Sequence, residues 1–238
     1  MLKIENLTKK FGEKLAVDNL SLNVEAGEIC AFIGHNGAGK TTTLRCIAGI
    51  TGFDEGEIFV NNISVKTNSF EAKKLIAYLP DNPELYEHLK GIEYLNFIAD
   101  VFLIDKDTRQ KRIEEYAKKL EIYNDLGFAI SSYSHGMKQK LALVSALLHE
   151  PKLLLLDEPF VGLDPNASYQ FKLIMQELAS KGTAIFYSTH VLEVAEKLCS
   201  NVVIIKNGKL VESGKMEDVK GKKSLESIFL ELENETNA

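Results

Sequence analysis

The amino-acid sequence predicts an α/β fold with a mostly parallel sheet, an N-terminal antiparallel β-subdomain and an inserted α-helical subdomain. Three observations lead to this prediction. An apolar run, a glycine-rich loop and a helical segment follow one another between residues 28 and 48. Strand-like and helical segments alternate again after residue 150, as expected for parallel strands joined by helices. Between these regions, at about residues 84–150, apolar residues recur at helical spacing.

The composition and length favour one large domain of ordinary globular character. The chain has 238 residues, of which 45% are hydrophobic and 26% are charged, so there is ample material for a buried core. No apolar run approaches the roughly 18 residues that a membrane-spanning helix needs, and Leu2–Thr8 alternates like a strand rather than like a secretory signal. We therefore expect a cytoplasmic protein, which can still dock peripherally on the inner face of the cell membrane through a surface patch.

Charge and cysteine content argue against two classes of function. The net charge is −6, and no block of lysine and arginine is long enough for a nucleic-acid-binding arm, so we expect no nucleic-acid partner. Cys30, Cys46 and Cys199 are far apart in apolar surroundings, which is typical of small core residues in a reducing compartment. Neither disulfides nor a zinc site is expected.

The N-terminal third contains two hairpin signals. Residues 1–27 alternate in hydrophobicity and turn at Phe11–Lys14, so strands are expected on either side of that loop. Glu57–Val60 and Ile63–Val65 flank Asn61-Asn62, which is a favourable hairpin turn. These segments form the predicted antiparallel β-subdomain.

The loop at Gly34–Thr41 is the most informative stretch of the chain. It reads Gly-His-Asn-Gly-Ala-Gly-Lys-Thr and fits the phosphate-binding P-loop pattern, G-x-x-x-x-G-K-S/T, without a mismatch. Glu28–Ile33 before it reads as a strand, and Thr42–Ala48 after it reads as a helix that Gly49 ends, which is the context this motif requires. The sequence therefore predicts binding of a nucleoside triphosphate.

Each residue type in this loop has a role in holding phosphate. Small residues let the backbone wrap closely around the anion, so that N–H groups point at it. The Lys40 ammonium adds positive charge beside the β- and γ-phosphates, so we expect Lys40 to be a catalytic residue as well. The Thr41 hydroxyl can ligate Mg²⁺. The nucleotide-binding residues expected from the loop are Gly34, Asn36, Gly37, Ala38, Gly39, Lys40, Thr41 and Thr42.

The second half of the chain supplies the remaining strands of the sheet. Strand signals return at Lys152–Asp157, Thr183–Ser188 and Asn201–Ile205, and a helical stretch at Ala167–Lys181 separates the first two. The alternation predicts a mostly parallel sheet.

The chain is expected to end in a short tail. Ile204–Glu212 bends at Asn207-Gly208, a type I′ hairpin signal. We place the main domain at residues 1–215 and a weakly helical tail at residues 216–238. In this tail, three apolar residues could form a small docking face: Leu225, Ile228 and Leu230.

Two acidic residues follow a run of four leucines. Leu153–Leu156 suits a strand buried on both faces of a parallel sheet, and Asp157 and Glu158 come at its carboxyl end, where ligands of such sheets bind. Asp157 is suited to hold Mg²⁺, directly or through water, and Glu158 is placed to accept a proton from the water that attacks the γ-phosphate. If these two residues are considered alone, they could instead form an acidic loop that caps the strand. The P-loop elsewhere in the chain favours the catalytic interpretation.

Two further segments have both a structural and a functional interpretation. Parallel neighbouring strands would bring His190 to the edge that carries Glu158, where it could contact the γ-phosphate or orient Glu158; a surface or core histidine is the alternative. Ser132–Lys140 precedes a helix expected at Leu141–Leu148, and its serine and glycine residues cap the helix and leave donors free for an anion. A simple N-cap is the alternative for this segment.

In this order, the motifs resemble those of the ATP-binding cassette ATPases, over residues 1 to about 215. Gly34–Thr41 resembles the Walker A motif, Leu153–Glu158 resembles the Walker B motif with its catalytic glutamate, and Tyr133–Met137 resembles the family signature. The resemblance implies a RecA-type P-loop NTPase core that takes ATP with Mg²⁺.

The same resemblance implies roles for three residues outside these motifs. Phe11 falls where the family places an aromatic ring that stacks on adenine. His190 matches the switch histidine, and Gly162-Leu-Asp164 matches the D-loop, which places Asp164 near the nucleotide at a dimer interface.

Two motifs depart from the usual pattern of this family. The signature, usually Leu-Ser-Gly-Gly-Gln, has His135 and Met137 where Gly and Gln are usual, but Ser134 and Gly136 remain at the two positions that would contact the γ-phosphate. Nucleotide contacts are therefore expected from residues 134–136. In the Q-loop, Asp81 stands where Gln is usual; it is one methylene shorter and cannot donate as Gln can, but its carboxylate could bind Mg²⁺, directly or through water.

The resemblance implies that this chain is one subunit of a larger transporter complex. Leu79–Tyr86 and Tyr133–Gln139 look most like the subgroup that serves bacterial exporters of drugs, peptides or bacteriocins, in which the transmembrane permease subunits are separate chains. In the family, two cassettes pair head to tail around two ATP molecules, so that the signature of one chain closes on the γ-phosphate held by the other. One kind of chain can supply both halves of such a two-fold interface, so a homodimer is expected. Hydrolysis by Glu158 would release the dimer and drive a membrane partner that is touched near the Q-loop and the helical subdomain.

The alternative is a non-transport ATPase of related design that acts on nucleic acid or ribosomes. Chromosome-structural ATPases carry a long coiled coil between the P-loop and the signature, whereas 93 residues without sustained heptads separate Lys40 from Ser134 here. Translation-associated factors have two cassettes and a basic linker, and both are missing from this sequence. A P-loop small-molecule kinase would leave the signature unexplained.

Overall fold

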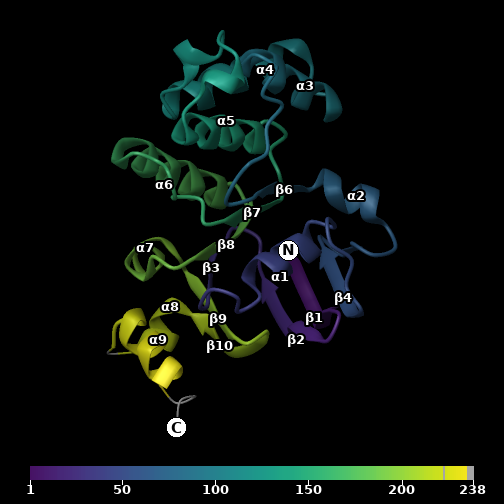
Figure 1. Cartoon of the computed structure of the whole chain (residues 1–238), viewed down its shortest axis with the longest axis vertical. Helices are drawn as coiled ribbons and strands as arrows, with labels where there is room; N and C mark the ends of the chain where they lie inside the picture. The colour runs from purple at the N-terminus through teal and green to yellow at the C-terminus, as the bar shows by residue number, and fades with distance from the viewer. Residues whose placement is uncertain (222, 235–238) are drawn as a thin grey trace.

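The computed structural model describes residues 1–221 and 223–234, and in it two sheets are surrounded by helices (Figure 1). The larger sheet has six strands in the order β10-β9-β3-β8-β7-β6. The smaller one has four strands in the order β2-β1-β4-β5, and all its pairings are antiparallel. The α/β fold class predicted from the sequence is therefore confirmed.

The strands of the larger sheet are β3 (Ile29–Ile33), β6 (Ile76–Leu79), β7 (Leu153–Asp157), β8 (Ala184–Thr189), β9 (Asn201–Lys206) and β10 (Lys209–Lys215). Those of the smaller sheet are β1 (Leu2–Phe11), β2 (Lys14–Val24), β4 (Glu55–Val60) and β5 (Ile63–Ser64). In the larger sheet, only the β9–β10 pair is antiparallel; the pairings of β9 with β3, β3 with β8, β8 with β7 and β7 with β6 are parallel.

The core lies on both faces of the parallel sheet. Successive residues of β7 alternate between two apolar clusters: Leu154 and Leu156 face one cluster, and Leu153 and Leu155 face the other. All four leucines are fully buried, which agrees with the interpretation of this run as a central strand. In the register of β7 against β8, Asp157 pairs with Ser188, which places the acidic residues at the carboxyl end of the sheet.

Helices cover the two faces. Those between β3 and β7 are α1 (Lys40–Ile47), α2 (Ser69–Lys74), α3 (Gly91–Val101), α4 (Lys106–Lys119) and α5 (His135–Leu147), together with the short 3₁₀ turns Tyr123–Asp125 and Ile130–Ser132. The later ones are α6 (Pro165–Ser180), α7 (Leu192–Leu198), α8 (Met216–Lys220) and α9 (Leu225–Asn234). In Figure 1, α3, α4 and α5 form a separate layer at the top of the molecule, as expected for an inserted α-helical subdomain. Within the described part of the chain, none of these helices has the length and apolar character needed to cross a membrane.

Several features differ from the sequence-based expectation. The helix expected at Leu141–Leu148 begins six residues earlier, at His135, because Ser134 caps it and Gln139 is buried inside it. The edge strand β6 and the short helix α7 were not expected, because four or seven residues carry too little periodicity to be recognised.

The turns and the tail follow the sequence more closely. Asn207 and Gly208 both have positive φ, 50° and 80°, as a type I′ turn requires. In the tail, Leu225 and Ile228 pack into the protein's own core, whereas Leu230 is 51% exposed. Most of the expected docking face is therefore used within the chain.

Candidate functional site

The P-loop connects β3 to α1 and is held tightly by neighbouring backbone. A Cβ atom at Gly34 would lie 2.6 Å from the carbonyl oxygen of Ile205, so only glycine fits there. Gly39 has a φ of +107° and lies against the carbonyl oxygen of Ala16. The loop is also anchored from the β9–β10 turn, where the Gly208 N–H donates to the Ala38 carbonyl at 2.9 Å. The glycines thus serve both the turn and its close packing.

Lys40 is buried inside this loop. Its Nζ donates to the carbonyl oxygens of Gly34 at 2.6 Å and of His35 at 3.2 Å. Burial lowers the pKa of the Lys40 ammonium, and the nearby carboxylates of Glu158 and Asp157 partly oppose that shift. An anion bound in the loop would add further negative charge beside this ammonium, at the N-terminus of α1, where the helix dipole also favours it.

A pocket of about 280 Å³ opens over the loop. It brings together residues from four regions that are far apart in the sequence: the β1–β2 hairpin, the P-loop, the segment after β6 and the end of β7. Ten of the expected site residues line it, namely Phe11, Asn36, Gly37, Gly39, Lys40, Thr41, Thr42, Asp81, Asp157 and Glu158. Gly34 and Ala38 form the buried part of the loop behind the pocket.

Phe11 stands at the outer rim of this pocket. Its ring is 53% exposed, and Lys9 Nζ lies 5.0 Å from the ring centroid. A flat, exposed aromatic ring beside a phosphate loop offers a stacking surface for a base. The adenine-stacking role expected for Phe11 stays a prediction.

Asp157 is held in position by the neighbouring strand. One of its carboxylate oxygens accepts a hydrogen bond from the Ser188 hydroxyl, and residues 157 and 188 are paired in the β7–β8 ladder. The other oxygen, Oδ2, is buried and has no hydrogen-bond partner among the described residues. An unpartnered buried carboxylate oxygen is costly unless a cation or donor joins it.

The residues around Asp157 fit Mg²⁺. The ion prefers oxygen ligands and keeps several of them from water and phosphate. In the described ranges, no group of three or more His, Cys, Asp or Glu residues could hold a metal without other ligands. The donors that the chain offers, Asp157, Asp81 and the Thr41 hydroxyl, therefore suit an ion that arrives with a nucleotide.

Glu158 and His190 form the second polar pair of the site. His190 Nδ1 lies 2.9 Å from Glu158 Oε2, and the His190 N–H donates to the same oxygen at 3.4 Å. Glu158 has a left-handed backbone, with φ of 49°, and its N–H donates to the Ser188 hydroxyl at 3.2 Å. A left-handed non-glycine residue is uncommon, and here it follows directly on the end of β7. The sheet therefore brings His190 to Glu158, one of the two placements considered for this histidine.

The signature segment lies elsewhere on the surface. Ser134 and His135 are exposed, and Ser134 caps α5 by accepting a hydrogen bond from the Met137 N–H at 3.3 Å. None of the residues 134–136 is among the described residues that line the pocket. The structure therefore separates these expected nucleotide contacts from the P-loop of the same chain.

Asp164 belongs to the surroundings of the signature. It caps α6 by accepting from the Ala167 N–H at 2.9 Å, and its carboxylate lies 2.7 Å from Lys140 Nζ on α5. The bond from the Ala167 N–H and the Lys140 ammonium lower the pKa of this carboxyl. Gly162 packs against the His135 ring, so the segments at 134–136 and 162–164 form one surface.

Three residues of the site escaped the sequence analysis. Lys14 and Ala16 on β2 line the pocket, and Ser188 holds both acidic residues at the end of β7. Lys14 and Ala16 belong to no motif, so no signal in the sequence could have found them. Ser188 could have been found, because it ends the strand that precedes His190.

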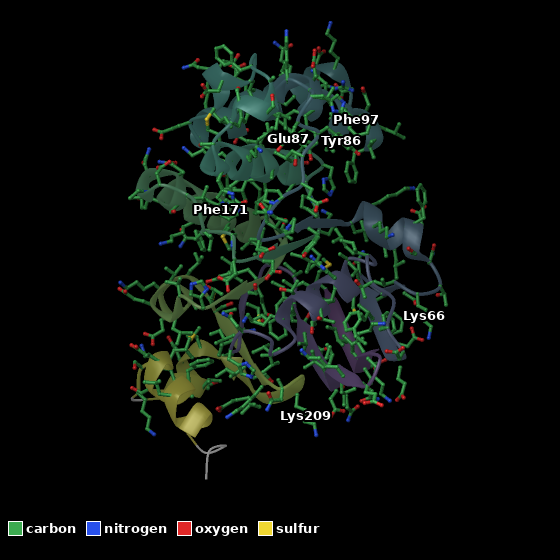
Figure 2. All side chains as sticks on the ribbon, viewed as in Figure 1. Lys66, Tyr86, Glu87, Phe97, Phe171 and Lys209 are labelled. Atoms are coloured by element: carbon green, nitrogen blue, oxygen red, sulfur yellow. The ribbon has the colours of Figure 1, made fainter. Side chains whose placement is uncertain are left out.

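A second surface lies where β6 meets the helical layer. A groove of about 290 Å³ runs between the segment after β6 and helices α3 and α5 and is lined by Leu79, Pro80, Pro83, Leu85, Tyr94 and Ile98, among others. Tyr86 and Phe97 stand beside it, 51% and 44% exposed, with ring centroids 5.7 Å apart. Figure 2 shows these two rings next to each other at one edge of the helical layer.

Comparison with known proteins gives consistent matches along most of the chain. The family model described as ABC transporter matches residues 17–161. The uncharacterized ABC transporter ATP-binding protein MJ1023 of Methanocaldococcus jannaschii is 40% identical over 218 residues, which cover 92% of this chain and 79% of the relative.

Solved structures agree with these sequence matches. A structure described as the ATP-binding subunit of an ABC transporter superposes with a TM-score of 0.94 and 32% identity, and covers 98% of this chain and 99% of the other. The ATP-binding cassette MJ0796, in a dimeric post-hydrolysis state bound to ADP and Pi, superposes with a TM-score of 0.81 and 25% identity, over 91% of this chain and 99% of that one.

Proposed function

Because this chain belongs to the family of ABC transporter ATP-binding proteins, we propose that it hydrolyses ATP as one half of a head-to-tail dimer that powers an exporter. The observation that carries this proposal is the divided site. The pocket over the P-loop contains Lys40, Asp157 and Glu158, whereas the segment at 134–136, in which Ser134 and His135 are exposed, lies outside it. A second copy that turns its own segment 134–136 toward this pocket would complete the site.

The residues of one chain account for binding and for the proton transfer. Backbone N–H groups of the P-loop and the Lys40 ammonium hold the phosphates, and Phe11 stacks on the base. The Glu158 carboxylate accepts a proton from the attacking water, and His190, whose Nδ1 lies 2.9 Å from Oε2, holds this carboxylate in place. When Mg²⁺ is bound, it supplies positive charge to the β- and γ-phosphates; Asp157, Thr41 and Asp81 are the residues that would hold it.

The groove beside Tyr86 and Phe97 is the proposed contact with the transmembrane subunits. Exposed aromatic rings beside an apolar groove are typical of a protein-binding surface. The contact is connected to segment 134–136, because Glu87 forms an ion pair with Lys138 on α5 and its carbonyl oxygen accepts from the Ser131 N–H at 3.0 Å. A membrane partner that moves this surface would therefore move the segment that closes on ATP.

Export, rather than import, is proposed on the resemblance of two segments to drug, peptide and bacteriocin exporters. These are Leu79–Tyr86, which runs from the end of β6 along the groove, and Tyr133–Gln139, which contains the signature. Peripheral attachment to the inner face of the cell membrane follows from the same proposal.

A sizing experiment tests the dimer. The Glu158→Gln variant, incubated with ATP and Mg²⁺, is expected to elute as a dimer, because ATP stays bound when no residue accepts the proton. With ADP it is expected to elute as a monomer. Adding Ser134→Arg to this variant places a bulky side chain at the dimer contact, and is expected to restore the monomer while ATP binding remains.

The proposal fails if Glu158→Gln stays monomeric with ATP shown to be bound, both alone and in the presence of the membrane subunits. A wild-type chain that binds ATP but releases no phosphate under either condition would contradict the ATPase itself.

A further inference from the structure

The C-terminal tail contacts the segment that carries His190. Only one residue separates His190 from the start of α7. This helix has seven residues, of which Ala195 alone is buried. So short a helix does not hold itself in place in water and depends on what packs against it. In Figure 1, α7 lies close to α8 and α9, at the lower left of the molecule.

Glu196 on α7 is the main polar link to the tail. Its carboxylate accepts a hydrogen bond from the Leu225 N–H, at the first residue of α9. The same carboxylate lies 3.0 Å from Lys220 Nζ, at the end of α8. These two contacts lower the pKa of the Glu196 carboxyl, as expected for a charge that the fold stabilises. One side chain of α7 therefore holds two elements of the tail.

Apolar contacts reinforce this link. Leu225 is fully buried and Ile228 is 9% exposed, both within the core cluster that also contains Ala195. One residue further on, Phe229 lines a pocket of about 460 Å³ together with His190, Leu192, His35 and Glu158, among others. The tail thus contributes a wall to the cavity beside the catalytic pair.

We infer that helix α9 acts as a clamp on α7, with Glu196 and Phe229 as positioning residues that keep His190 within hydrogen-bond distance of Glu158. This inference rests on the proposed ATPase function of the site. Glu196 and Phe229 act through His190 rather than on the nucleotide. Their loss should therefore slow turnover without weakening the binding of ATP.

The first test is kinetic and uses the full chain. Glu196→Ala and Phe229→Ala are each expected to lower kcat about tenfold, since misplacing a catalytic group by a fraction of an ångström has effects of this order, while KM and the Kd for ATP stay within about twofold. Glu193→Ala is the matched control, because Glu193 lies on the same helix, is exposed and pairs only with Lys197 among the contacts described. It is expected to leave kcat unchanged.

The second test asks whether Glu196 acts through His190. In a His190→Ala background, adding Glu196→Ala is expected to cause no further loss, because the positioned group is already missing. If Glu196→Ala lowers kcat by the same factor in both backgrounds, the inference is wrong. Glu196→Gln keeps the acceptor for the Leu225 N–H but loses the charge, and is expected to retain more activity than Glu196→Ala.

A third measurement needs no ATPase activity and separates this inference from the proposed function. Hydrogen exchange of the amides at residues 190–199 is expected to quicken about tenfold in Glu196→Ala but not in Glu193→Ala, while exchange in β7 and β8 is unchanged. Unchanged exchange in both variants would overturn the clamp, whatever the activity of the wild-type chain.

Discussion

His190 Nδ1 lies 2.9 Å from Glu158 Oε2, and the His190 backbone N–H points at the same oxygen. The contact joins the ends of two adjacent parallel strands, β7 and β8, whose register is fixed by pairs such as Asp157 with Ser188. Two donors on one carboxylate oxygen restrict the direction in which that carboxylate faces the pocket. We therefore propose that His190 orients the Glu158 carboxylate.

Replacing His190 tests this role. His190→Ala is expected to lower kcat about 100-fold, which is typical for the loss of a group that supports proton transfer, while the Kd for ATP changes little. Steady-state kinetics with fluorescent-nucleotide titration separates the two effects. His190→Gln can still donate to Glu158 and is expected to lose less. A raised KM with unchanged kcat in His190→Ala would instead assign His190 to ATP binding.

Two glycines of the P-loop make it possible to distinguish the stability cost of a steric clash from the cost of backbone strain. Gly39 and Gly37 both have positive φ, +107° and +83°, but Gly39 lies against the Ala16 carbonyl whereas nothing lies within 4 Å of a Cβ at Gly37. Gly37→Ala is expected to cost about 1 kcal/mol of stability, and Gly39→Ala at least about twice that, because β2 must also move. Urea denaturation checks the difference, and equal costs for the two variants would contradict it.

His149 predicts a dependence of stability on pH. It stacks on Phe102 with ring centroids 3.8 Å apart, and its Nε2 lies 3.2 Å from the Ile76 carbonyl oxygen. Burial lowers the pKa of His149 from 6.5 to about 4, and the Arg112 charge adds to that shift. Between these two values the unfolded chain binds more protons than the folded one, so the free energy of unfolding falls as the pH drops from 6.5 toward 4.

The expected loss from this histidine between pH 7 and pH 4.5 is about 2 kcal/mol. His149→Gln keeps a donor for the Ile76 carbonyl but does not titrate, so its free energy of unfolding should fall less over the same range. Urea denaturation of both proteins at the two pH values measures the difference. An identical pH dependence would show that His149 is not the group responsible.

Gln139 predicts a substitution that stabilises the chain. It lies fully buried on α5, and neither atom of its amide has a hydrogen-bond partner among the described residues. Gln139→Met keeps the volume and removes both unpartnered groups, so the free energy of unfolding should rise by about 1 kcal/mol. Gln139→Ala, which leaves a cavity, should lower it. A less stable Met variant would mean that the amide finds partners that the contacts described here do not include.

Removing the aromatic pair beside the groove is expected to weaken binding of the membrane subunits without affecting the ATP site. Tyr86→Ala combined with Phe97→Ala is expected to reduce retention of the membrane subunits about tenfold or more, because buried aromatic residues dominate such contacts. ATP binding by the isolated chain should be unchanged. Tyr169→Ala, which removes an exposed ring from α6, is the control, and equal effects of the control and the pair would contradict this docking surface.

Local sequence determined the parts of the site that depend on residue type and short spacing. The strand, loop and helix around Gly34–Thr41 could be predicted because glycine, lysine and threonine at fixed positions specify both the turn and the phosphate chemistry. The four leucines before Asp157 could be placed on a central strand, because a strand of a parallel sheet is buried on both faces. The Asn207-Gly208 turn was predictable for a similar reason, since both positions need positive φ.

Tertiary structure decided which of these pieces meet. The sequence does not state that β3 lies between β8 and β9, and this order is what packs Ile205 against Gly34 and aligns the loop with β7 and His190. It does not state that Lys14 on β2 reaches the pocket, or that segment 134–136 lies outside it. Motifs are local, because a few neighbouring residues fix the backbone and carry the chemistry. The sharing of one pocket depends on strand order and on packing between residues far apart in the chain, which no short pattern encodes.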